Sequence, residues 1–164
     1  MEKKYLTCSV ICGKKETMSL DFKYFLLDWF GDFLKNSSVR EFIFIRDYDW
    51  NFEHFVYGYV NYHKETYPDI RMIHLKEKFF YSQSEQLNEQ YVYDYSVVCK
   101  KLINCKRNLD AKKNMIKIER SDVCIFYYNS MEEKEDIDNA LEHAKKLKKK
   151  IIIISNDNIK ELTQ

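Results

Sequence analysis

The sequence predicts an α/β protein, a three-layer sandwich of about five parallel strands with helices on both faces. Short apolar runs alternate along the chain with longer segments whose apolar residues recur every three or four positions. Such alternation is typical of parallel sheets with right-handed helical crossovers. The chain has 164 residues, 45% of them hydrophobic, with one Pro and three Gly. No Gly-, Pro- or Ser-rich linker divides it, so residues 1–164 are expected to form a single domain.

The first strand is expected at Tyr5–Cys12, an apolar run that ends at the turn residue Gly13. Ser19–Lys35 is expected to be helical because its apolar residues recur at helical spacing, and Ser19 can cap its start. Phe42–Ile45, with the sequence FIFI, is short and continuously apolar, as buried parallel strands tend to be.

A second helix is expected over Asn51–Tyr67, with Asn51 as its cap and Pro68 as the residue that stops it. Ile70–Leu75 follows as a third strand. Residues 76–109 are rich in Tyr, Gln, Glu and Asn and show no single period. We expect an elaborated loop or a partial helix there.

The remaining elements repeat the alternation of helix and strand. They are expected as a helix at Ala111–Arg120, a strand at Asp122–Tyr128, a helix at Asp136–Lys149 and a strand at Ile151–Ser155. Acids begin the last of these helices and lysines end it, which complements the helix dipole.

Several short motifs lie within or next to these expected strands and helices. They are Cys12-Gly13-Lys14-Lys15, Phe52-Glu53, Tyr67-Pro68-Asp69-Ile70, Asn114 with Ser121-Asp122, and Ala140 with Ala144-Lys145. With them the chain resembles the small single-domain members of the SLOG superfamily, a Rossmann-like group that includes the lonely-guy phosphoribohydrolases and the DNA-processing A proteins. The resemblance covers about Tyr5 to Ser155. It implies a Rossmann-like sheet and a ligand site at the carboxyl edge of the strands.

The glycine motifs of that group are degenerate here. Its members usually carry Gly-His-Arg after strand one, Gly-x-x-Gly-x-Phe-Asp after strand two, Arg-Asn ahead of strand four and Gly-Gly after it. In this chain the family's Arg-Asn pair aligns with Lys113-Asn114 or, alternatively, with Arg107-Asn108. By resemblance, a surviving ligand site would use Gly13, Lys14, Lys15, Asp47, Trp50, Glu53, Lys113, Asn114, Glu135 and Asp136.

The replacement of the family's glycines by larger residues predicts the loss of the backbone site that would hold a phosphate. Glycine lets backbone N–H groups approach a phosphate closely, whereas Asp47 and Trp50 would fill or reshape that approach. Glu135 and Asp136 would repel an anion at the helix start, although ordinary helix stabilisation explains the same acids. We expect a shallow acidic depression above Gly13, Asp47 and Glu135.

No catalytic residues, metal site or cofactor are predicted. The chain lacks the Pro-Gly-Gly-x-Gly-Thr loop of lonely-guy enzymes, and its four histidines are scattered. Acids at the carboxyl edge are of the type that holds Mg²⁺ or Ca²⁺, but solvated acids are far commoner than ligands. Those acids are Asp47, Asp49, Glu53, Glu135 and Asp136.

Four tyrosines stand out in residues 76–109, namely Tyr81, Tyr91, Tyr93 and Tyr95. Aromatic residues in a polar, charge-poor setting are typical of protein interfaces or of a lid over a small ligand. The alternative is that these rings simply cover one face of the sheet. We expect this segment to be the functional surface, with a homo-oligomer formed through it.

Charge, hydropathy and cysteine content restrict the expected binding partners and the expected cellular compartment. The 27 Lys and Arg against 26 Asp and Glu provide no excess positive field for a nucleic acid. No apolar run approaches the ~20 residues that cross a membrane. The five cysteines show no CxxC spacing, and no signal-peptide cleavage site follows Met1. A cytoplasmic protein is expected.

Two functions fit these observations. The first is a degenerate SLOG-like domain that acts as a non-catalytic binding or protein-interaction module. The alternative is a protein that binds or hydrolyses a nucleotide-derived small molecule at a surviving carboxyl-edge site. We favour the first, because the motifs that would hold a phosphate are the ones that have changed.

Overall fold

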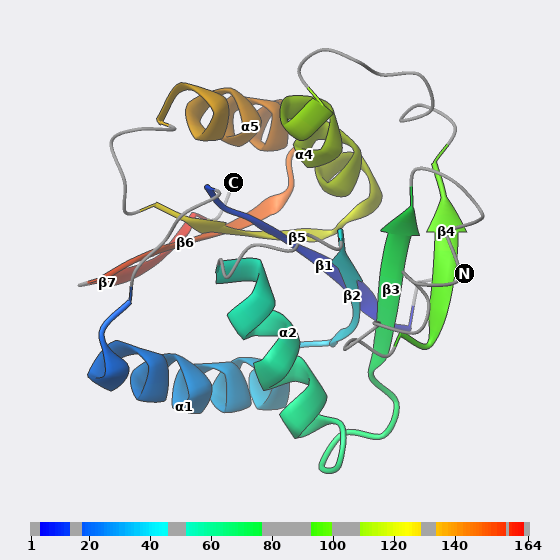
Figure 1. Ribbon diagram of the computed structural model, residues 1–164, viewed down its shortest axis with the longest axis vertical. Helices are drawn as coiled ribbons and strands as arrows, with labels where there is room; N and C mark the ends of the chain where they lie inside the picture. Colours follow the sequence, from blue (N-terminus) through cyan, green and yellow to red (C-terminus); the bar gives the residue numbers. More distant parts are fainter. Residues whose placement is uncertain are drawn as a thin grey trace, which may run out of the picture.

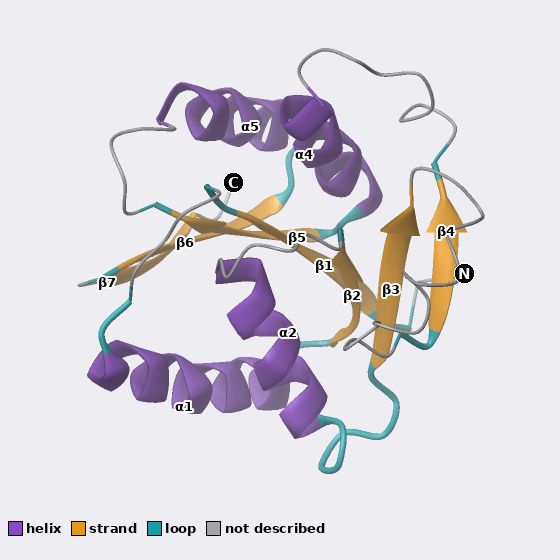
Figure 2. Cartoon of the chain, viewed as in Figure 1, coloured by secondary structure: helices purple, strands orange, loops and turns teal. Residues whose placement is uncertain are grey.

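The computed structural model describes residues 4–13, 18–45, 52–76, 93–99, 109–128, 134–156 and 158–162. These residues form one seven-stranded sheet with helices on both faces, which confirms the predicted α/β class (Figures 1 and 2). The strands are β1 (Leu6–Ile11), β2 (Val39–Phe44), β3 (Arg71–Lys76), β4 (Tyr95–Val98), β5 (Val123–Tyr127), β6 (Lys150–Ser155) and β7 (Asn158–Leu162). The helices are α1 (Leu20–Asn36), α2 (Phe52–His63), α4 (Leu109–Arg120) and α5 (Lys134–Lys146).

The strand order is β4-β3-β2-β1-β5-β6-β7. β1 to β6 are parallel and β7 is antiparallel to β6. The chain steps outward from β1 in one direction through β2, β3 and β4, then crosses back to build the other half from β5. This is the doubly wound arrangement of Rossmann-like folds.

The sheet has more strands than the five expected. β4 lies inside residues 76–109, which the sequence predicted as a loop or partial helix, and β7 follows the last expected strand. β4 has only four residues, none of them fully buried, and β7 is mostly exposed. Edge strands of this kind carry little of the apolar signal that marks a central parallel strand.

Side chains of alternate strand residues build two apolar layers. Figure 1 shows α1 and α2 on one face of the sheet and α4 and α5 on the other. The face under α1 and α2 holds the largest cluster, including Phe30, Phe42 and Tyr127. The face under α4 and α5 holds a cluster around Ile118 and Phe126, and a third cluster of Ile43, Ile73 and Leu75 beside α4.

The helix limits follow the predicted signals at some ends and depart from them at others. Ser19 caps α1, because its hydroxyl accepts a hydrogen bond from the N–H of Phe22 at 3.2 Å. α2 ends at His63, four residues before the predicted end at Tyr67. The N–H groups of Thr66 and Tyr67 bond to the carbonyl of His63, so a turn completes the segment before Pro68.

Two of the motifs that carry the resemblance have structural roles. Asp122 accepts a hydrogen bond from the N–H of Thr7 at 2.8 Å and thereby ties the start of β5 to β1. Arg40 pairs with Asp69 at 3.3 Å and lies over the ring of Tyr67, which holds the Tyr-Pro-Asp turn against β2. Both contacts secure the amino-terminal side of the sheet.

Neither a disulfide nor a membrane-spanning helix is found in the described ranges. Cys8, Cys12, Cys99 and Cys124 are all free thiols. Burial raises the pKa of Cys8 well above its usual value and that of Cys124 to about 11, so both thiols stay protonated and unreactive at neutral pH. None of the described helices is both long enough and apolar enough to cross a bilayer.

Candidate functional site

Ligands in doubly wound folds bind at the carboxyl edge of the parallel strands. Six of the predicted site residues belong to described segments near this edge: Gly13 after β1, Glu53 in α2, Lys113 and Asn114 in α4, and Glu135 and Asp136 in α5. Lys14, Lys15, Asp47 and Trp50 lie outside the described residues. The expected acidic depression involves Asp47 and therefore stays a prediction.

The carboxylate of Glu53 is turned into the protein. Its Oε1 accepts a hydrogen bond from the N–H of Ile45 at 3.0 Å and lies 3.2 Å from the Nζ of Lys117. The side chains of Glu53 and Lys117 are only 10% and 5% exposed. Because Ile45 follows β2 and Lys117 belongs to α4, this carboxylate joins a strand end and two helices, and it is engaged inside the structure.

An aromatic stack closes the space beside this pair. The rings of Phe52 and Tyr127 lie parallel, 4.3 Å apart between centroids, and both side chains are fully buried. Phe52 begins α2 and Tyr127 ends β5, so the stack spans the end of β1, which lies between β2 and β5. The hydroxyl of Tyr127 donates to Asn156 at 2.5 Å and satisfies its polar end. Two buried apolar rings thus pack together near the point at which the strand order reverses.

The start of α5 already carries negative charge. Glu135 and Asp136 are exposed in its first turn, where carboxylates complement the helix dipole. Asp138, in the next turn, accepts a hydrogen bond from the hydroxyl of Tyr128 at 2.6 Å. Burial and this bond raise the pKa of Tyr128 to about 12. A phosphate at this helix start would meet two carboxylates of its own sign.

The described carboxylates at this edge do not gather as metal ligands. Within the described segments, no group of three or more His, Cys, Asp or Glu side chains is placed to hold a metal ion. Glu53 points inward to Lys117, whereas Glu135 and Asp136 stand exposed on α5.

The predicted tyrosine surface is divided by the sheet. Tyr81 and Tyr91 lie outside the described residues. Tyr93 packs on the face of α1 and α2, stacked on His74 with ring centroids 4.6 Å apart. Tyr95 begins β4, is 44% exposed and lies on the opposite face beside Ile73. The two described tyrosines therefore belong to different surfaces.

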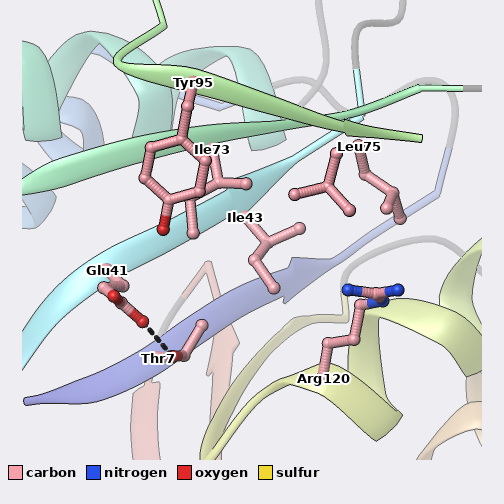
Figure 3. Close-up of a pocket in the computed structure, with 8 residues that line it drawn as sticks. Thr7, Glu41, Ile43, Ile73, Leu75, Tyr95 and Arg120 are labelled. Carbon is pink, nitrogen blue, oxygen red and sulfur yellow. Dashed lines mark hydrogen bonds between the residues drawn. The ribbon is translucent and has the colours of Figure 1, made fainter. Parts of the chain in front are cut away.

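The face that carries Tyr95 contains a cavity that the sequence did not predict (Figure 3). It has a volume of about 250 Å³ and lies over β1 to β4 beside the last turn of α4. Its lining residues are Thr7, Glu41, Ile43, Ile73, Leu75, Tyr95, Val97 and Arg120. The strand register explains the set, since Thr7 pairs with Glu41, Ile43 with Ile73, and Leu75 with Val97.

The cavity is apolar along its middle and polar at its ends. The hydroxyl of Thr7 donates to Oε2 of Glu41 at 2.6 Å, and the Tyr95 hydroxyl lies on the same side as Glu41 (Figure 3). Arg120 of α4 stands on the other side of Ile43 in this view. Burial raises the pKa of Tyr95, and the carboxylates of Glu41 and Asp94 add to the effect, so this hydroxyl keeps its proton at neutral pH.

The sequence contained a partial signal for this cavity. Glu41 directly precedes the run FIFI, and a carboxylate next to a buried strand is unusual enough to be noted. Tyr95 and Val97 could not be placed beside it, because β4 was not predicted as a strand.

The described residues define a doubly wound α/β protein with a buried ion pair and an aromatic stack near the carboxyl ends of its central strands, and with a cavity on one sheet face. Comparison of the sequence with protein-family models gives no match, and a search of curated proteins gives none either.

Proposed function

We propose that this protein is a SLOG-like Rossmann domain that has lost its nucleotide site and acts as a non-catalytic binding or interaction module. The observation that carries the proposal is the burial of the described residues near the carboxyl ends of β2 and β5. The stack of Phe52 on Tyr127 and the buried pair of Glu53 and Lys117 lie near the strand ends beside which such folds hold nucleotides, and their side chains are engaged with one another. The acids at the start of α5 further disfavour a phosphate.

Exposed apolar side chains on α1 support an interaction role. Leu20, Tyr24 and Phe25 are 64%, 62% and 51% exposed, although large apolar residues usually contribute to a core. They follow one another along the first turns of a single helix. A group of this kind, edged by Asp21 and Asp28, is the sort of surface that partner proteins cover. Self-association through residues 76–109 belongs to the same proposal.

Thermal unfolding with a nucleotide panel tests this function. AMP, ATP and NAD⁺ at about 1 mM should leave the melting temperature unchanged, because the proposed function includes no nucleotide site. A nucleotide that did bind, present at 100 times its Kd, would add about 2.7 kcal/mol of stability and would be detected. Isothermal titration calorimetry measures nucleotide binding directly, and chromatography of the incubated nucleotides detects any cleavage.

Saturable nucleotide binding or nucleotide cleavage would overturn the proposal. In that case the alternative function predicts that the double substitution Lys14→Ala and Lys15→Ala removes the effect. The matched double substitution Lys145→Ala and Lys146→Ala, at the far end of α5, serves as the control for the loss of two positive charges.

A further inference from the structure

We propose that this protein binds a second copy of itself, with the exposed face of α1 in one copy seated on the end of α5 in the next. The proposal rests on the interaction role proposed above and names the partner. It differs from self-association through residues 76–109, because it joins two unlike surfaces that both belong to the described residues.

The exposed face of α1 combines apolar and acidic side chains. Its members are Leu20, Asp21, Tyr24, Phe25 and Asp28. Residues four apart on a helix are neighbours, so Leu20, Tyr24 and Asp28 form one row, and Asp21 and Phe25 form a second row beside it. Neither aspartate side chain has a hydrogen bond or an ion pair within the part of the chain that the structure describes. The face therefore offers apolar area and unpaired negative charge together.

The end of α5 carries the complementary combination. Lys146, Leu147 and Lys148 are consecutive and exposed, and Leu147 is 42% accessible to solvent. Among the described residues, neither of these two lysine side chains has a hydrogen-bond or ion-pair partner. An apolar side chain between two unpaired ammonium groups matches the α1 face in polarity and opposes it in charge. Such complementarity is what orients two protein surfaces toward each other.

The backbone at the end of α5 holds these side chains in place. Lys148 has φ 54°, the left-handed conformation in which a helix commonly ends and which favours glycine. The N–H groups of Lys148 and Lys149 donate to the carbonyls of Lys145 and Ala144 at 2.9 and 3.0 Å and close the turn. A lysine therefore occupies a position that glycine would fit better, so the turn itself does not explain the charged side chain.

The placement of the two surfaces makes the contact intermolecular. α1 and α5 cover opposite faces of the sheet, so the two surfaces do not meet within one copy (Figure 1). Each contact uses the α1 face of one copy and the α5 end of another, and such contacts build a ring or an open row rather than a two-fold dimer. One helix face buries less than the roughly 1,200 Å² typical of stable interfaces, so we expect weak, reversible association.

Sedimentation equilibrium of the unmodified protein tests whether copies associate. As the protein concentration rises from about 10 µM to 1 mM, the weight-average mass should rise above that of one chain. Salt at about 0.5 M should lower this mass relative to about 0.05 M, because it screens exposed charges. A mass that stays at one chain throughout, or one that salt does not lower, overturns the proposal without any variant.

Two variants then assign the contact to its surfaces. The α1 variant carries Tyr24→Ser and Asp28→Asn, and the α5 variant carries Leu147→Ser and Lys148→Gly. Each variant alone should remain at the mass of one chain, because one of the two surfaces is lost. An equimolar mixture should form dimers and nothing larger, since only one intact pair of surfaces remains.

Exposed residues at the end of α2 and just beyond it provide the matched control. Tyr62→Ser with Glu65→Gln also removes one exposed tyrosine and one exposed acid, and this variant should associate like the unmodified protein. The α5 variant should keep its melting temperature, because Leu147 is exposed and glycine suits the left-handed backbone at Lys148. Its loss of association is then not a loss of fold.

The proposal is overturned if the unmodified protein associates but the mixture of the two variants does not, because another surface would then be responsible. It is also overturned if the control variant loses association as fully as the α1 variant does. The nucleotide panel tests the carboxyl edge and these masses test α1 and α5. A nucleotide that binds would therefore contradict the proposed function alone, and a protein that stays monomeric would contradict this inference alone.

Discussion

The ion pair of Glu53 and Lys117 places two opposite charges almost wholly out of water. Desolvating such groups costs several kcal/mol each, and the mutual attraction offsets this cost only while both partners are present. The N–H of Ile45 shares the carboxylate, so the pair also orders the chain after β2. Its role in this structure is to connect elements.

Removal of one charge should therefore be costly. Glu53→Gln keeps an acceptor for Ile45 but leaves Lys117 unpaired, and we expect it to lower the free energy of unfolding by about 3 kcal/mol or more. Lys117→Met should have a similar effect, and the double variant should lose less than the sum of the two. Urea unfolding measures all three.

An exposed pair provides the control for that cycle. Glu142 and Lys145 on α5 lie 2.7 Å apart but are 61% and 39% exposed, so Glu142→Gln and Lys145→Met should each cost about 0.5 kcal/mol or less. Equal losses at the buried and exposed pairs would show that burial does not decide the contribution of Glu53.

A second carboxylate, Asp94, ties the start of β4 to its neighbours. Its Oδ2 accepts from the N–H of Met72 at 2.7 Å and lies 2.9 Å from the Nζ of Lys64. Burial disfavours its charged form, but the N–H group and the ammonium outweigh this effect, and the pKa of Asp94 is lowered. The folded state therefore binds this proton less tightly than the unfolded chain does.

Asp94 should make stability depend on pH in the acid range. Its contribution is fully present above the unfolded pKa of about 3.9, and it is lost as pH falls through the lowered folded value. We expect Asp94→Asn to cost about 1 kcal/mol at neutral pH, because the site is partly exposed. The difference from the unmodified protein should shrink below about pH 4. A difference between Asp94→Asn and the unmodified protein that stays constant with pH would contradict the assignment.

At the scale of elements, the strands differ in how they are protected. β1 and β5 have strands on both sides, and every residue of β5 is buried. β7 pairs with β6 alone, in antiparallel register, and most of its residues are exposed. Local opening costs least where few apolar contacts are lost, so β7 should open more readily than β1 and β5.

Amide hydrogen exchange should reveal this difference. We expect amides of β1 and β5 to exchange only through global unfolding, and those of β7 to exchange at least about tenfold faster through local opening. Mass spectrometry of proteolytic fragments follows both. Raising the urea concentration below the unfolding midpoint should accelerate amide exchange in β1 and β5 and leave the exchange rates of β7 nearly unchanged. Equal protection of all three strands would show that the sheet opens as one unit.

The elements that were predicted are those whose own residues carry a strong pattern. α1 has apolar residues at helical spacing and Ser19 as its cap, and the structure places the helix within one residue of the predicted limits. Among the central strands, β5 is continuously apolar and buried throughout, because helices cover both faces of the sheet. β4 and β7 were missed because edge strands draw their stability from a neighbouring strand, and a neighbour is not visible in a local window of sequence.

At the scale of the whole molecule, the sequence predicts which residue types lie near the carboxyl edge but not the contacts that these residues make. The replacement of glycines and the acids of α5 indicated that a phosphate would be disfavoured there. That Glu53 turns inward depends on Lys117, which stands 64 residues away in sequence. The stack of Phe52 on Tyr127 likewise joins residues that meet only after β5 has been added beside β1.

Local sequence was sufficient for the fold class, because the periods of strands and helices are written in neighbouring residues and the crossover rule then orders them. The cavity required the assembled sheet. Thr7, Glu41, Ile73 and Tyr95 come from four strands, and their side chains share one face only because parallel pairing sets their register. Arg120 reaches the same space because α4 packs beside those strands. Sites of this kind depend on long-range pairing, and no local pattern in the chain encodes it.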